Sequence, residues 1–459
     1  MVIIIKNWTT GETSNCRLAV VRGCVAENSW PIVSENDDIL VTYGTTVGLW
    51  PVHNGHFKAV VELERGVNDV RFKYKEEQVL LTLRLVVHNT ELCVVPLYVV
   101  CDGHDGRFQA PEGTDNSLDS ACRRIALGAH LVQSLYAEKL LEKGLPRKTF
   151  QVENDLDPGS PTCRVLHSQL TMSEARKLKQ EDLWEFIGRE IMTSPIASEK
   201  RKYLAILSCT FWDGTKVVAD PALGGGGLAL LGSGTLHTWP ESLSQLIHCF
   251  TDQRKMPPGL QDNSCFRGTF AGCLSTSLGS VCHEVGHMFN LGHTPTGIMS
   301  RGFDNVERVF LSVPSPQVKG CAKVDDTNNL ILVPCLSISS STLPTVGKPE
   351  RASCPASETS EDDFTSFTSA CAAILAHHKW FNNETSETST VTYDPIRNLV
   401  SSEAGLKVVQ LRGSSGSVIK SWELGSKSPH KHLILPRLKV PHATLVAINS
   451  FGSILSQQI

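Results

Sequence analysis

The sequence has few of the features that mark membrane-spanning, secreted or nucleic-acid-binding proteins. Among its 459 residues, no stretch approaches the roughly 20 apolar residues needed to cross a bilayer. The N-terminal MVIIIKNW has no charged segment ahead of a long apolar run, so no secretory signal peptide is expected. The net charge of −4 argues against a general binder of nucleic acid or membrane surfaces. We therefore expect neither nucleic acid nor a membrane as a partner.

Closely spaced cysteine pairs are also missing. The 15 cysteines are odd in number, scattered along the chain and free of C-x-x-C pairs. This pattern favours reduced thiols, so the expected location is the cytoplasm or the nucleus. The remaining composition, with 41 % hydrophobic and 20 % charged residues, is ordinary for a globular protein. The length suits about two to four domains.

One stretch carries a dense set of metal-binding side chains. Between Ser275 and Met299 the sequence reads STSLGSVCHEVGHMFNLGHTPTGIM, which contains H-E-x-x-H-x-x-x-x-x-H. His283 and His287 are four residues apart, so on a helix they share one face and can bind one Zn2+. Glu284 lies at the edge of that face, where it can reach a metal-bound water and take its proton. By chance, three His and one Glu at these offsets should occur about 0.002 times in such a chain.

A third ligand has to come from beyond the helix, and His293 is the candidate. The helix must end and the chain must double back, which requires a residue with positive φ. Asn290, followed by Gly292, suits that turn. The residues 294–297 then form a tight turn that brings Met299 beneath the site. One coordination position stays open for water and substrate.

These residues resemble the signature of the metzincin metallopeptidases, H-E-x-x-H-x-x-G-x-x-H followed by a methionine turn. The match is complete in the three His, the Glu and Met299, and it departs at Asn290, which replaces the Gly of the motif. The segment GIMSRGFDN (297–305) and the layout of the chain resemble a poorly characterised eukaryotic family of metzincin-type zinc metallopeptidases. The resemblance implies one Zn2+ per chain as cofactor and a peptide or protein substrate.

In metzincins the strand upstream of the zinc helix borders the substrate cleft, and the resemblance places that strand at 228–234. An extended peptide would add to the free backbone of such an edge strand. A glycine-rich surface loop is an equally weighted alternative. His237, just downstream, is expected on the surface. The expected substrate-binding residues are Leu228, Ala229, Leu230, Leu231 and Gly232.

The residues of the motif favour a zinc-dependent endopeptidase with Glu284 as general base and then general acid. A zinc hydrolase of a non-peptide amide or ester would use the same ligands. A non-catalytic binding or scaffold protein with structural zinc is the third alternative. Glu284 argues against it, because a structural site fills all four positions with protein ligands and only three are found. The oligomeric state leaves no signature in the sequence.

The overall pattern predicts an α+β fold in three parts. Residues 1–95 alternate short β-rich runs with glycines, and G-x-F-x-A-x-V-x-L-x-x-G-x-N from Gly55 looks like an immunoglobulin-like β-sandwich. Residues 96–385 are expected to form a metzincin-like catalytic domain, with a mixed twisted sheet plus helices. Residues 386–459 return to short strands and predict a small C-terminal β domain.

Helix and strand signals give approximate boundaries within these parts. The clearest expected strands are 38–42, 57–63, 67–74, 79–87, 97–101, 149–152, 203–212, 406–411, 418–424, 432–435 and 444–448. The expected helices are 118–143, a helix from a capping box at Thr171 towards Met192, 240–249, 276–289 and 364–376. The residues 312–355 are expected to form a surface insertion. His377 and His378 are expected to close a helix end rather than bind metal, because neighbouring residues on a helix face different ways.

Overall fold

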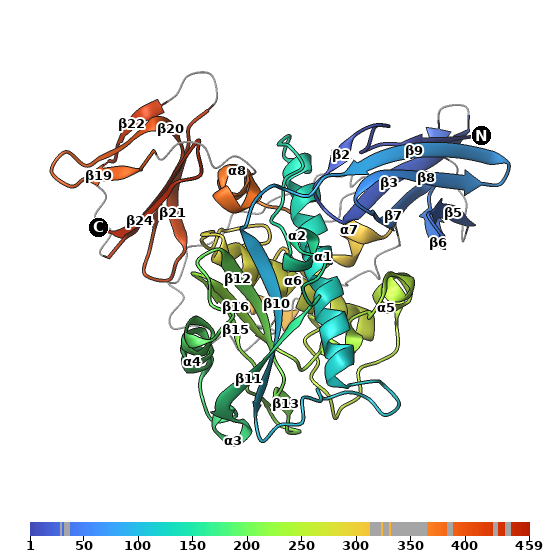
Figure 1. Ribbon diagram of the computed structural model, residues 1–459, viewed down its shortest axis with the longest axis horizontal. Helices are drawn as coiled ribbons and strands as arrows, with labels where there is room; N and C mark the ends of the chain where they lie inside the picture. The colour runs from blue at the N-terminus through green and yellow to red at the C-terminus, as the bar shows by residue number, and fades with distance from the viewer. Residues whose placement is uncertain are drawn as a thin grey trace.

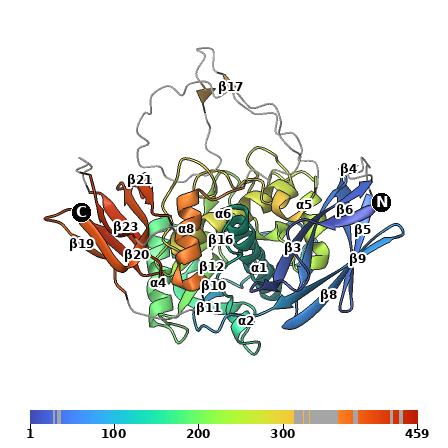
Figure 2. The ribbon, with the colours of Figure 1, turned by 90° about the horizontal axis from the view of Figure 1, so that it is seen from above.

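The computed structural model describes residues 1–27, 30–31, 37–312, 323–324, 330–331, 365–382, 389–425, 430–436 and 442–459. They form three large sheets and two short two-stranded pairs, with helices around the middle large sheet, which confirms a mixed α+β fold. In Figures 1 and 2 the N-terminal and C-terminal sheets lie on opposite sides of the central unit. The predicted insertion at 312–355 falls outside the described residues, apart from Ser312 and two short strand pieces, β17 (Lys323–Val324) and β18 (Leu330–Ile331). The domain limits at 95 and 385 stay a prediction.

The N-terminal unit is one nine-stranded sheet in the order β1-β3-β7-β6-β5-β8-β9-β2, with β4 paired to β3. Neighbours run antiparallel except β2 and β9, and β1 contacts β9, so the sheet curls on itself. The four strands expected from the sequence here are confirmed, whereas β1 to β4 and β6 were not foreseen. The immunoglobulin-like assignment stays a prediction. The strands are β1 (Val2–Ile5), β2 (Thr13–Ser14), β3 (Leu18–Glu27), β4 (Trp30–Pro31), β5 (Asp37–Tyr43), β6 (Thr46–His53), β7 (His56–Glu62), β8 (Gly66–Tyr74) and β9 (Glu77–Leu85).

The central sheet has five strands in the order β11-β10-β12-β16-β15. The first four are parallel to one another, and β15 runs antiparallel to β16 at the end of the sheet. A separate hairpin, β13 with β14, follows β12. The strands are β10 (Cys93–Asp102), β11 (Arg164–Thr171), β12 (Arg201–Leu207), β13 (Phe211–Trp212), β14 (Val217–Val218), β15 (Ala222–Gly225) and β16 (Leu228–Gly232).

Helices cover both faces of the central sheet. Along β10, Val94 and Tyr98 pack into the core with α1 and α6, whereas Val95 and Leu97 pack with α4 on the other face. Burial on both faces explains why β10 and β12 read as nearly continuous apolar runs. The helices are α1 (Leu118–Glu142), α2 (Glu153–Leu156), α3 (Met172–Ala175), α4 (Gln180–Thr193), α5 (Leu246–Thr251), α6 (Phe270–Met288), α7 (Glu307–Phe310) and α8 (Ser369–His377), with 3-10 turns η1 (Leu236–Thr238), η2 (Leu243–Gln245) and η3 (Lys379–Phe381). Among the described residues, no helix is long and apolar enough to cross a membrane.

The long helix α1 supports the metal-binding motif from behind. It begins after Ser117, whose side chain accepts a hydrogen bond from the Ser120 amide, and it ends before Gly144 at φ +73°, as the sequence predicts. The buried Tyr136 hydroxyl donates to the Cys282 carbonyl at 2.7 Å, one residue before His283. Around the Tyr136 ring lie four other aromatic rings, from Phe150, Phe289, Phe367 and Phe381.

Several sequence predictions in the central unit need correction, among them the strand at 203–212, which ends at Leu207, and the helix at 364–376, which begins at Ser369. The strand predicted at 149–152 makes a single bridge, between Val94 and Val152. The capping box of Thr171 and Glu174 is present, but it opens the four-residue α3, and α4 starts separately at Gln180. The helix predicted at 240–249 is a 3-10 turn followed by α5, which ends at Thr251.

The C-terminal unit is a six-stranded antiparallel sheet built on the long strand β20. This strand pairs with β19, β21, β22 and β23, and β24 pairs with β23. The four strands expected here are confirmed. The unit packs against α8 through β20, β21 and β23. Its strands are β19 (Thr392–Asp394), β20 (Leu399–Arg412), β21 (Val418–Glu423), β22 (His430–Ile434), β23 (Thr444–Asn449) and β24 (Ile454–Gln458).

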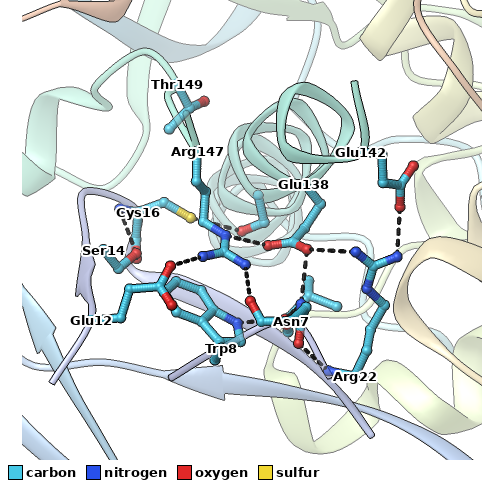
Figure 3. Close-up of polar contacts among 12 residues, drawn as sticks. Asn7, Trp8, Glu12, Ser14, Cys16, Arg22, Glu138, Glu142, Arg147 and Thr149 are labelled. Atoms are coloured by element: carbon cyan, nitrogen blue, oxygen red, sulfur yellow. Dashed lines mark hydrogen bonds and ion pairs between the residues drawn. The ribbon is translucent and has the colours of Figure 1, made fainter. Parts of the chain in front are cut away.

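A buried arginine, Arg147, joins the N-terminal residues to the central unit (Figure 3). Arg147 Nε donates to Glu138 Oε1 at 2.7 Å, and both side chains are at most 5 % exposed. The guanidinium also donates to Glu12 and to the Asn7 carbonyl, and it stacks 3.4 Å from the Trp8 ring. One cation therefore holds the N-terminal residues against α1 and the loop that follows it.

We expect Arg147→Ala to lower the free energy of unfolding by about 3 kcal/mol, because Glu138 stays buried without its closest cation. Lys431→Ala is the control, since its pair with Glu403 is exposed to solvent and should change the free energy of unfolding much less. Urea unfolding of the full chain measures both. Equal losses in the two variants would contradict the role given to the buried pair.

Candidate metal centre

The motif lies on α6, which begins at Phe270 rather than at the expected 276. Thr269 caps it by accepting a hydrogen bond from the Gly272 amide. The helix is buried on nearly all sides, between the central sheet, α1 and α5. The helix can be buried in this way because the residues around the histidines and the glutamate of the motif are small or apolar. His283 and Glu284 are therefore held in the interior by packing on every side.

The chain turns back directly after α6. Asn290 has φ +63°, the left-handed conformation expected from the sequence. The Leu291 amide donates to the Gly286 carbonyl at 2.9 Å, which closes the end of the helix. The reversal brings His293 alongside the last turn of α6.

Three imidazole rings meet at this turn. The Nε2 atom of His287 lies 3.0 Å from Nε2 of His283 and 3.0 Å from Nε2 of His293. Within the described part of the chain, His283, His287 and His293 form a group whose ligand atoms are close enough to hold one metal ion. Zinc bonds of about 2.0–2.1 Å to nitrogen put tetrahedral ligand atoms about 3.3 Å apart. The spacing and the all-nitrogen donor set fit a zinc ion bound by His283, His287 and His293.

Each ring is fixed on its far side by a backbone carbonyl. His283 Nδ1 lies 2.8 Å from the Ile298 oxygen, and His287 Nδ1 lies 2.9 Å from the Leu291 oxygen. His293 Nδ1 lies 3.3 Å from the Ser415 oxygen. A carbonyl accepts only, so each Nδ1 carries the hydrogen and each Nε2 presents a lone pair.

Burial keeps two of the rings neutral. It lowers the pKa of His283 to about 4 and the pKa of His287 to about 3, and the neighbouring imidazoles act in the same direction. Neither ring is therefore protonated near neutral pH in the ion-free chain, which leaves both free to bind a cation. Burial also raises the pKa of Glu284 to about 8, while the Gly224 amide, which donates to this carboxylate, acts in the opposite direction.

Met299 packs against the turn of α6 between His283 and His287. Its side chain is 1 % exposed, and a Cβ added to Gly286 would overlap its sulfur. The Thr294 amide donates to the Met299 carbonyl at 3.0 Å, which closes the loop between the third His and the Met. Met299 therefore forms the floor below the helix turn that carries His283 and His287.

The expected sheet edge at 228–232 is wrong. The strand β16, with Leu228, Ala229, Leu230, Leu231 and Gly232, is hydrogen-bonded on both sides, to β12 and β15. Four of its five residues are buried. The end of the sheet nearest the centre is β15, whose residues are half-buried. The prediction failed because β15, the strand that precedes β16, is short and glycine-rich and has little apolar pattern of its own.

Gly224 of β15 lies directly against α6 at Glu284. A Cβ at this position would overlap the backbone carbonyl of Glu284, so only glycine permits the approach. The neighbouring Gly225 has much more room, with the Trp184 ring 3.8 Å from its Cβ position. Among the four glycines at 224–227, Gly224 therefore lets the strand contact the helix, whereas Gly225 has free space beside it.

The other histidines considered in the sequence, and Cys282 beside the motif, are not part of this group of three. His237 is buried rather than exposed, with its ring 5.6 Å from Phe270, because η1 packs under α6. His377 and His378 bond to different partners, Ala373 and Trp380, at the end of α8, as expected. Cys282 is fully buried and packs in the core. Sequence reasoning missed Gly224 and the contacts of His293 with the C-terminal sheet, and no motif marks either.

A helix that presents two imidazoles, followed by a turn that returns a third, gives the chain a group of histidines that could hold a metal ion. Comparison with known proteins makes this specific. Residues 2–344 match the model of a family described as "Putative peptidase family", and the chain belongs to that family.

Two curated relatives carry names that agree with this membership. A "putative zinc metalloproteinase" of Schizosaccharomyces pombe is 27 % identical over 345 residues, covering 67 % of this chain and 53 % of that protein. Another of the same description from Saccharomyces cerevisiae is 28 % identical over 311 residues, covering 59 % of this chain and 44 % of that protein. The chain thus spans about half the length of the curated relatives it matches. Their names support zinc as the metal and a peptidase at the level of the family.

We expect Gly224→Ala to lower the free energy of unfolding by about 1–3 kcal/mol, because the added methyl group forces β15 away from α6. Gly225→Ala, one residue along the same strand, should change it far less. Chemical unfolding of both variants measures the difference. If the two substitutions had the same effect, the close approach of β15 to Glu284 would be contradicted.

Proposed function

We propose that the chain is a zinc-dependent metallopeptidase with His283, His287 and His293 as metal ligands and Glu284 as general base and then acid. The observation that carries this proposal is the meeting of three imidazoles, with the Nε2 atom of His287 3.0 Å from the other two, beside the buried carboxylate of Glu284. Buried ionisable groups gathered around one point are typical of active sites. The family membership and the names of the relatives agree with this activity.

The residues of the chain divide the work of hydrolysis. When bound, the ion would polarise the scissile carbonyl and make a water molecule acidic enough to lose a proton near neutral pH. Glu284 would accept that proton and return it to the amine that leaves. The Gly224 amide, which bonds the carboxylate, would hold Glu284 in position through both transfers. Met299 and Gly286 would fix the floor beneath the histidines.

We further propose β15 as the strand that binds substrate, in place of Leu228–Gly232. Within the described residues β15 pairs only with β16, so no strand occupies its other side. An extended peptide could pair there as an added antiparallel strand. Because Gly224 touches Glu284, a peptide on this side would pass beside the general base. Backbone pairing of this kind favours a peptide over a small amide or ester.

The metzincin class is part of the same proposal. It is supported by the parallel sheet with one antiparallel end strand, the helix α6, the left-handed turn at Asn290 and the buried Met299. The cytoplasmic or nuclear location stays a prediction from the cysteine pattern. The immunoglobulin-like character of residues 1–95 likewise stays a prediction.

Glu284→Gln should lower kcat/KM for peptide hydrolysis by about 10²–10⁴, because the amide cannot accept a proton. Zinc content should stay at one ion per chain, since this side chain is not a ligand. A digest of a peptide library by wild type and variant, with zinc analysis of the same samples, measures both. Full activity in the variant would exclude Glu284 as the base. Cleavage of ester or amide probes without cleavage of any peptide would favour a non-peptide hydrolase.

His293→Ala should weaken zinc binding by more than about 100-fold, because two imidazoles remain on the helix. His167→Ala, an exposed histidine on β11, is the control and should bind zinc as wild type does. Competition with a chelator of known affinity gives the comparison. Unchanged affinity after loss of His293 would mean that a different residue is the third ligand.

A further inference from the structure

The third imidazole differs from the other two in where its support comes from. The carbonyls that fix His283 and His287 belong to Ile298 and Leu291, which lie within the motif segment itself. The carbonyl that faces His293 belongs to Ser415, in the turn between β20 and β21 of the C-terminal sheet. This turn lies outside the residues 2–344 that match the peptidase family.

Both the backbone and the side chain of His293 are bonded to that turn. The His293 amide donates to the Gly416 carbonyl at 3.1 Å, and the Val418 amide donates to the His293 carbonyl at 2.8 Å. The two bonds form a parallel bridge between His293 and Ser417. Together with the contact at Nδ1, three interactions fix the position and rotation of this ring.

A buried arginine, Arg412, also bonds the chain reversal just before His293, at Asn290. Arg412 is 8 % exposed and donates to the Asn290 carbonyl at 2.6 Å, while Gln410 accepts two of its hydrogen bonds. A Cβ on Gly292 would lie 2.7 Å from Arg412 Nε and 2.8 Å from the Gly416 oxygen. The chain reversal between α6 and His293 is thus packed directly against the C-terminal hairpin.

We propose that residues 412–418, the metal-ligand clamp, position the third zinc ligand, so that the C-terminal β unit completes the metal centre. The proposal rests on the zinc site proposed above. His293 is the exposed member of the three, so it lacks the packing that holds His283 in place. A carbonyl at Nδ1 selects the tautomer whose Nε2 lone pair faces the other two rings. Removing such a partner typically costs 10–100-fold in metal affinity.

Gly416→Val in the full chain tests the clamp. Gly416 has φ +74°, which a β-branched residue resists, so the substitution should displace the Ser415 and Gly416 carbonyls. Gly44→Val is the matched control, because Gly44 has φ +51° in a hairpin of the N-terminal sheet and its Cβ position contacts nothing within 4 Å. Chelator competition should show zinc affinity lowered about 10–100-fold in Gly416→Val and changed less than about twofold in Gly44→Val.

A second readout separates positioning from general loss of structure. Cobalt(II) in place of zinc gives a visible spectrum that depends on the ligands and their geometry, and Gly416→Val should alter it while Gly44→Val does not. Should Gly416→Val fail to fold, Arg412→Met takes its place, since it keeps the apolar stem and removes the bond to Asn290. Wild-type zinc affinity and an unaltered cobalt spectrum in the folded variant would overturn the clamp alone. A wild-type chain that binds no zinc would instead overturn the proposed function.

Discussion

Three imidazole rings converge only because each is bonded on its far side. An unsupported histidine can rotate about two bonds and exchange its proton between two nitrogens. Here each Nδ1 faces a backbone carbonyl, from Ile298, Leu291 or Ser415. The rings therefore keep one rotation and one tautomer, and the three Nε2 lone pairs point into the same small volume. Everything proposed about catalysis depends on this fixed geometry.

Close packing around α6 maintains that geometry. A Cβ would overlap the Glu284 carbonyl at Gly224, the Phe303 carbonyl at Gly279 and the Met299 sulfur at Gly286. The sheet, the loop before α7 and the segment that carries Met299 thus approach the helix more closely than side chains at these positions would allow. Interiors packed in this way transmit small displacements instead of absorbing them. The metal centre is consequently sensitive to changes at positions that hold no ligand.

The sequence allowed prediction of whatever is local in the chain. Spacing alone indicated one helical face for His283 and His287, and the choice of Asn290 for a left-handed residue is seen in its φ of +63°. The capped helix α1 and four strands in each outer sheet follow from turn residues and alternation. These features depend on neighbours a few residues apart, which periodicity and capping describe well.

Long-range contacts were not predictable in the same way. The order of strands decided that β15, and not β16, ends the sheet, and no residue in 222–232 encodes that order. The contact of His293 with Ser415 joins positions 122 residues apart, and Ser-Ser in a glycine-bounded turn looks like any surface hairpin. His237 was misplaced for the same reason, because the packing of η1 under α6 buries a residue in a polar stretch. Each of these wrong or missing predictions depends on a contact between residues that are distant in the sequence, which local patterns do not describe.

X-ray absorption at the zinc edge, on the zinc-loaded full chain, tests the central claim most directly. The account predicts three imidazole nitrogens at about 2.0–2.1 Å and a single oxygen from solvent. A sulfur neighbour near about 2.3 Å, or a shell with fewer than three imidazoles, would contradict it.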